Sequence, residues 1–168
     1  MRTEALIREE LKKDLNRLDM AVKMLQHSLQ ECEKIGIKTD YSLEELDRFE
    51  SLTSRFARTS DIYTQKIMKG IILILREEAN TFIDRVNLFE KLEISSAEEL
   101  KLIRDLRNEI SHEYRVDDIT EIFEAVIEYS HKLIEIIEKT KSFSETIGRK
   151  MLLTEETAMP TVSGHKRG

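Results

Sequence analysis

Apolar side chains recur along the chain at alternating steps of three and four residues, the spacing of one face of an α-helix. The pattern predicts a first helix over residues 3–35, ended by Gly36, where a left-handed cap residue is usual. The repeated positions form a narrow, heptad-like stripe that other helices must cover. They are Leu11, Leu15, Leu18, Val22, Leu25, Leu29 and Cys32.

Capping signals divide the rest of the chain into further helices with short connections. Ser42 followed by Glu45, and Ser96 followed by Glu99, have the spacing of capping boxes. On the helix that Ser96 begins, Leu102, Ile103, Leu106 and Ile110 form the expected core stripe. Asp117-Asp118 is expected to cap the last long helix. The predicted helices begin near residues 3, 42, 81, 96 and 117.

Two stretches of the second helix, expected to run to about residue 76, leave alternatives open. Its apolar face is interrupted at residues 59–61, which indicates either a solvent-facing bend or a point where Arg58 or Asp61 faces a site. Residues 71–75 are apolar on every side, so they lie either at the centre of a bundle or in a subunit contact.

Composition favours the same architecture. The 168 residues are 40% hydrophobic and 36% charged, with five Gly and one Pro, which is typical of long amphipathic helices. The sequence therefore predicts an all-α, up-and-down bundle of about five helices over residues 1–148, followed by a flexible tail over 149–168.

Charge, cysteine content and hydropathy limit the cellular compartments and the kinds of partner that the sequence favours. A single cysteine, Cys32, cannot form an internal disulfide and suits a reducing, cytoplasmic compartment. No apolar run has the length of a membrane span, and the first ten residues are too charged for a secretory signal. The net charge of −6 argues against broad nucleic-acid binding but permits a local basic cleft.

Candidate chemistry is concentrated in residues 104–115. Arg107 offers a planar fork of donors that suits a phosphate, and His112 can move a proton near neutral pH. Asn108 can orient a phosphate oxygen or the imidazole. Metal-ligand spacing is lacking, but RNA cleavage needs no metal because the ribose 2′-hydroxyl is an internal nucleophile. Alternatively, Arg107 and His112 are surface groups paired with nearby carboxylates.

The two residues do not stack on an ideal helix, where a five-residue separation places them roughly 140° apart. Three arrangements would bring them together. Arg107 reaches around the helix, the helix end relaxes near Glu113, or two copies of this helix face each other across a two-fold axis.

The stretch Arg107-Asn108-Glu-Ile-Ser-His112-Glu-Tyr114 resembles the R-N-x-x-x-H-x-Y signature of HEPN-domain proteins, and specifically of HepT-like toxins. The resemblance covers roughly residues 5–140 and includes the order of long and short helices and the Ser-Ala-Glu-Glu start before the motif. It implies an all-α homodimer in which the motif helices line a cleft at the interface.

The resemblance also implies a function. HepT-like toxins are ribonucleases that need neither metal nor cofactor, and they belong to type VII-like toxin–antitoxin pairs. By this likeness His112 is the acid/base residue, Arg107 binds the scissile phosphate and Asn108 assists. The partner implied is an MNT-type nucleotidyltransferase antitoxin, which silences the toxin by transferring AMP to the motif tyrosine, here Tyr114.

Two other functions compete with the toxin. HEPN-like proteins also resemble noncatalytic subunits that bind nucleotides or substrates for a nucleotidyltransferase, and the net acidity favours that alternative. The third possibility is a purely structural helical dimer, which the apolar run at residues 71–75 would also allow. The intact set of Arg107, Asn108, His112 and Tyr114 favours the ribonuclease.

Overall fold

The structure, a computed structural model, describes residues 2–112 and 119–157, with side chains described as far as residue 150. Its elements are α1 (Glu4–Ile35), α2 (Leu43–Ile62), a π-helical turn (Tyr63–Ile67), α3 (Met68–Leu75), α4 (Phe82–Lys91), α5 (Ala97–Ser111) and α6 (Ile119–Thr157). The π-helical turn joins α2 and α3 into one continuous rod. The described chain is therefore all-helical and has five rods, as the periodicity predicts.

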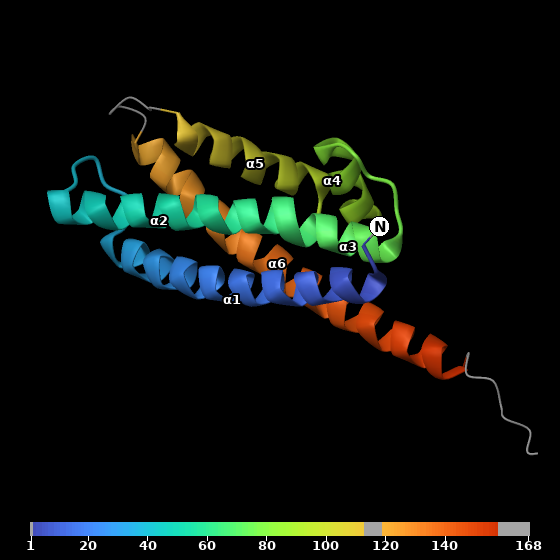
Figure 1. Ribbon diagram of the computed structural model, residues 1–168. Coiled ribbons are helices and arrows are strands. Elements are labelled where there is room, and N and C mark those ends of the chain that lie inside the picture. The colour runs from blue at the N-terminus through green and yellow to red at the C-terminus, as the bar shows by residue number, and fades with distance from the viewer. Residues whose placement is uncertain (1, 113–118, 158–168) are drawn as a thin grey trace, which may run out of the picture.

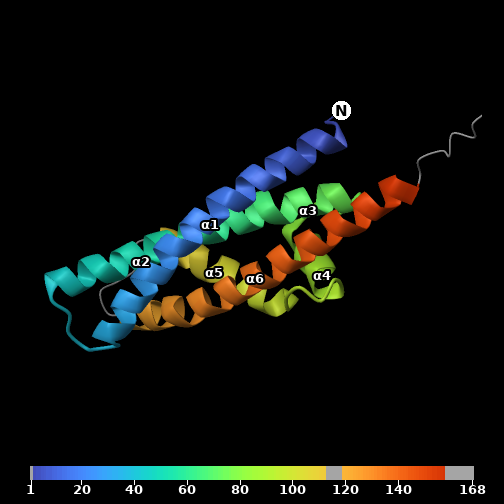
Figure 2. The same ribbon diagram turned by 90° about the horizontal axis from the view of Figure 1, so that it is seen from below.

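The long rods alternate in direction. The α2–α3 rod runs antiparallel to α1, and α5 runs antiparallel to α2 on the side away from α1 (Figure 1). The last helix, α6, crosses the bundle and extends past one end (Figures 1 and 2). The short α4 packs on α3 and α5 at one end of the bundle (Figure 1). This is the up-and-down arrangement expected from the short connections.

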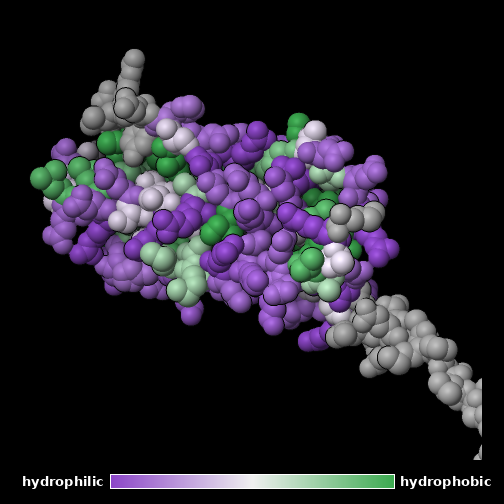
Figure 3. Space-filling view, viewed as in Figure 1, coloured by the Kyte–Doolittle hydropathy of each residue, from purple (hydrophilic) through white to green (hydrophobic). Residues whose placement is uncertain are grey.

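The predicted apolar stripes form the core. The first stripe is buried at Leu11, Leu18, Leu25, Leu29 and Cys32. Aromatic rings join α2 to α6, because Phe49 and Phe123 stack with their centroids 4.4 Å apart. The outer surface is mostly hydrophilic, with small scattered apolar areas on the face that Figure 3 shows. Burial of one narrow stripe per helix is what holds the rods together.

The four predicted helix starts that lie within the described residues, near residues 3, 42, 81 and 96, are confirmed, but two capping boxes are incomplete. Ser42 and Ser96 each accept a hydrogen bond from the third helical N–H, at 3.2 and 3.3 Å. The Glu45 carboxylate does not return to Ser42, because it pairs with Lys38 at 2.9 Å. The reciprocal box forms at Thr81 and Asp84 instead. Gly36 ends α1, as expected, but its φ of 75° and ψ of 175° lie outside the left-handed helical region expected for the cap.

The interruption at residues 59–61 is not a solvent-facing bend. Thr59 and Ser60 are buried, and the π-helical turn follows directly. The Thr59 hydroxyl donates to the Arg55 carbonyl at 2.7 Å, and the Thr64 hydroxyl donates to the Ser60 carbonyl at 2.9 Å. Such bonds absorb the polar side chains within the helix, and π turns often occur at functional sites.

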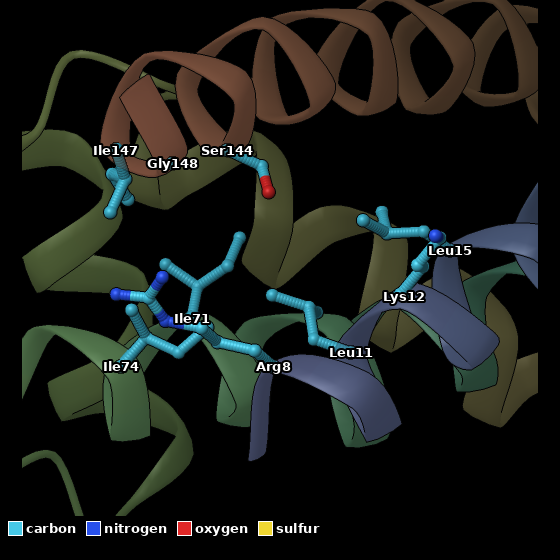
Figure 4. A pocket seen from close by; sticks show the side chains of 9 residues that line it. All are labelled: Arg8, Leu11, Lys12, Leu15, Ile71, Ile74, Ser144, Ile147 and Gly148. Carbon is cyan, nitrogen blue, oxygen red and sulfur yellow. The ribbon is translucent and has the colours of Figure 1, made fainter. Parts of the chain in front are cut away.

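The apolar run at residues 71–75 belongs mainly to the bundle interior. Ile71, Ile72 and Ile74 are buried, whereas Leu73 is 50% exposed. Beside it, α1, α3 and α6 leave an open apolar hollow of about 210 Å³ into which Leu11, Ile71 and Ile147 point (Figure 4). The first alternative for this run, the bundle centre, therefore holds for its three buried isoleucines.

One boundary prediction and one core prediction are wrong. The last helix does not end near Gly148 but continues to Thr157, so the segment expected to be a tail begins as helix. Leu102, expected in the core stripe of α5, is 39% exposed, whereas Ile103 and Leu106 are buried. The expected cap at Asp117-Asp118 lies outside the described residues. No helix within the described ranges has both the length and the apolar character needed to span a membrane.

Candidate active site

Arg107, near the end of α5, is clamped by a carboxylate from α2. Its Nε donates to Asp61 Oδ1 at 2.6 Å and its Nη2 donates to Oδ2 at 2.7 Å, a bidentate pair. The two side chains are 30% and 33% exposed. The Asp61 carboxylate raises the pKa of the Arg107 guanidinium further above its ordinary value. Of the two residues proposed to face the site from α2, Asp61 does so.

A third contact fixes the guanidinium. Arg107 Nη1 donates to the Ser111 hydroxyl one turn later, and that hydroxyl donates to the Arg107 carbonyl at 3.2 Å. Three of the five N–H groups of Arg107 are thus used, and one on each Nη remains for a ligand. The spacing of the sequence alone does not identify Asp61 or Ser111 as the residues that hold the Arg107 guanidinium, although Ser111 stands four residues after Arg107, within reach on a helix.

His112 ends the helix that carries Arg107. Its backbone is extended (φ −88°, ψ 148°), and its N–H bonds the Glu109 carbonyl at 3.1 Å. The side chain is exposed, and so is that of Asn108. The helix end therefore relaxes just before Glu113, the second of the three arrangements considered for bringing His112 toward Arg107.

The structure brings Arg107 and Asn108 to one hollow but leaves His112 outside it. Arg107 points toward α2 and is held there, and within the described residues no hydrogen bond joins it to His112. An Arg107 that reaches around its helix would first have to release Asp61. Tyr114, the expected site of AMP transfer, lies outside the described residues.

The hollow beside Arg107 is strongly basic. It has a volume of about 320 Å³ and lies where α2, α4 and α5 meet the π-helical turn and α3. We call it the basic hollow; its charged and aromatic lining residues are Asp61, Lys69, Phe82, Arg85, Arg104 and Arg107. Four cations and one carboxylate thus share one concave surface on a chain with a net charge of −6.

Comparison with known proteins leaves the site to be interpreted from its own chemistry. No family model matches the chain, and no curated protein or solved structure matches it either. Among the described residues, no group of three or more His, Cys, Asp or Glu side chains is arranged to hold a metal ion. What the described site offers is a clamped guanidinium, an exposed amide, an exposed imidazole at a helix end and a basic hollow.

Proposed function

We propose that this chain is a metal-independent endoribonuclease of the HepT-like, HEPN-domain type, acting as the toxin of a toxin–antitoxin pair in the cytoplasm. One observation carries the proposal. The signature Arg107 is clamped by Asp61 at the edge of a basic hollow, five residues before an exposed His112 at a helix end. A clamped guanidinium with two open N–H groups is suited to orienting a phosphate.

The chemistry follows from these groups. The His112 imidazole takes the proton of a ribose 2′-hydroxyl, and the 2′-oxygen attacks the adjacent phosphorus. The bond from phosphorus to the 5′-oxygen breaks, and that oxygen takes a proton from water or from a second imidazole. Arg107 binds the non-bridging oxygens as negative charge builds on them. The products are a 2′,3′-cyclic phosphate and a free 5′-hydroxyl.

The first prediction concerns these products. The purified chain is expected to cleave single-stranded RNA in excess EDTA and to leave 2′,3′-cyclic phosphate ends, identified by mass spectrometry. An otherwise identical strand with 2′-deoxyribose at the cleaved position should resist cleavage there, because it lacks the nucleophile. Cleavage of the deoxy position at an equal rate, or full inhibition by EDTA, would contradict this mechanism.

The proposal includes a homodimer and a regulator. Two copies of α5 would face each other across a two-fold axis, so that the helix ends bearing His112 line a shared cleft. The regulator would be an MNT-type nucleotidyltransferase that transfers AMP to Tyr114. A bulky anion beside the cleft would block RNA and repel its phosphates.

The second prediction concerns Tyr114. In cells that also make the nucleotidyltransferase, Tyr114→Phe should keep the toxin folded and active but abolish its silencing, because only the acceptor oxygen is lost. Mass spectrometry should find AMP on the wild-type peptide that contains Tyr114 and none on the variant. The nucleotidyltransferase is expected to silence a Tyr129→Phe control fully. AMP on another tyrosine would refute the assignment.

The described tyrosines make that control informative. Tyr63 is fully buried, and its hydroxyl hydrogen-bonds the Thr140 hydroxyl at 2.8 Å, so a partner enzyme cannot reach it. The Tyr41 hydroxyl accepts a bond from the Lys38 N–H at 2.8 Å. Tyr129 is only partly buried, which makes it the fairest comparison for Tyr114.

The alternative is a noncatalytic HEPN-like subunit that binds substrate or nucleotide for a nucleotidyltransferase. The observation that favours it is the occupied guanidinium, since Asp61 and Ser111 already use three of its donors. A chain that binds nucleotide but leaves RNA intact in the EDTA assay would establish this alternative over the toxin.

A further inference from the structure

The basic hollow contains more positive charge than the proposed cleavage chemistry requires. Arg107 is balanced by Asp61, but Lys69 from α3 and Arg104 from α5 form no ion pair within the described residues. Both side chains are exposed at the rim. Acidic residues outnumber basic ones in this chain, 33 to 27. Composition alone would therefore lead us to expect every cation to have a carboxylate nearby, not several unpaired cations in one hollow.

Arg85, from α4, supplies a second sign of a missing ligand. Its Nε is buried and has no hydrogen-bond partner among the described residues. Its Nη1 reaches only the Asn80 carbonyl, at 3.4 Å. A buried donor on a charged group without an acceptor is costly, and an anion that draws the Arg85 guanidinium into the hollow would remove that cost.

The hollow also has an aromatic surface. The guanidinium carbon of Arg104 lies 4.4 Å from the centre of the Phe82 ring, and that of Arg85 lies 5.9 Å from it. Guanidinium groups stacked over a half-buried ring make a flat, positive platform on which a nucleobase can stack. A site that binds only a phosphate would not need an aromatic surface, so the ring favours a ligand that also carries a base.

We propose that Lys69, Arg85 and Arg104, with Phe82, form a binding subsite for single-stranded RNA that continues from the scissile phosphate at Arg107. Arg107 and Asn108 line the same hollow, so a strand held at Arg107 enters it directly. Lys69 and Arg104 contact backbone phosphates, the Arg85 guanidinium turns toward a third anionic oxygen, and a base stacks on the platform that Arg104 and Phe82 form. This subsite rests on the proposed ribonuclease function and adds residues outside the signature.

The test measures binding without cleavage. A fluorescent single-stranded oligonucleotide with 2′-O-methyl ribose throughout is titrated with the full chain, and anisotropy is followed at several salt concentrations. Lys69→Gln and Arg104→Gln are each expected to weaken binding about 3- to 10-fold and to reduce the slope of log K against log salt by about 0.7, the value for one lost phosphate contact on a single strand. Lys23→Gln, an exposed lysine on α1, is the matched control and should bind like wild type.

Phe82→Leu separates stacking from charge. It keeps an apolar side chain against α5 and should weaken binding while leaving the salt slope unchanged. Wild-type affinity and slope in both Lys69→Gln and Arg104→Gln would overturn the subsite. Equal affinity for ATP and for the oligonucleotide, with the same sensitivity to these variants, would overturn it in favour of a free nucleotide.

Failure of the subsite is distinguishable from failure of the ribonuclease proposal. If Lys69→Gln and Arg104→Gln bind and cleave like wild type while His112→Ala is inactive, only the subsite is wrong. If the wild-type chain neither binds nor cleaves RNA, the function itself is wrong and the subsite falls with it.

Discussion

A His112→Ala chain is expected to lose RNA cleavage by a factor of roughly 10² to 10⁴, the usual contribution of a general acid/base group. Its fold should be unaffected. The side chain is exposed at the end of α5, and the helix-ending bond is made by the backbone N–H of residue 112 to the Glu109 carbonyl, which alanine keeps. No core cavity opens, so the unfolding temperature should stay within a degree or two of wild type.

Two readouts check this result. Fragmentation of a labelled RNA measures the chemistry directly, and growth after induction measures the proposed toxicity in cells. His27→Ala is the matched control, because His27 is an exposed histidine on α1 and lies away from the signature. The control should arrest growth and cleave like wild type. If His112→Ala cleaved RNA as fast as that control, the ribonuclease site would have to lie elsewhere.

Local sequence signals predict most of the fold because they act within a few residues. Gly36 terminates α1 and Ser42 and Ser96 begin their helices, since each cap depends only on adjacent backbone. The continuation of α6 past Gly148 could not be predicted from an apolar stripe. This part of α6 extends past the other described helices, so packing against them does not require such a stripe (Figures 1 and 2).

The clamp on Arg107 depends on long-range geometry. Asp61 and Arg107 are 46 residues apart and meet only because α5 packs on α2. The π-helical turn that follows Asp61 changes the phase of the rod, so an ideal helical period misjudges which side chains face α5 after it. The sequence feature that points to this contact is the polar interruption at residues 59–61, and it is equally compatible with a solvent-facing bend and with a residue that faces the site.

The basic hollow also cannot be predicted from the spacing of residues along the sequence. Lys69, Arg85 and Arg104 come from three different helices, and each is an ordinary surface cation on its own helix. Only the packing of α4 against α3 and α5 gathers them. The capping box of Thr81 and Asp84, which starts α4 and so positions Phe82 and Arg85, has a recognisable spacing in the sequence.

Co-expression of Arg107→Gln with His112→Ala should restore RNA cleavage that neither variant shows alone. The reason is the direction of Arg107, which Asp61 and Ser111 hold toward α2 while His112 lies beyond the end of α5. If each site takes Arg107 from one protomer and His112 from the other, a mixed dimer has one intact site and one doubly defective site. Random pairing gives mixed dimers half the time, so about a quarter of wild-type activity should return.

The design also tests the clamp and the dimer. Glutamine at position 107 can still hydrogen-bond Asp61, so the fold should be preserved while the fork proposed to bind phosphate is lost. Light scattering of the purified mixture should give twice the 19.7 kDa chain mass. Dimers without recovered activity would mean that Arg107 and His112 of one chain act together, which requires Arg107 to leave Asp61. In that case Asp61→Asn, which loosens the clamp, should speed cleavage, whereas in the shared site it should slow it by misplacing the guanidinium.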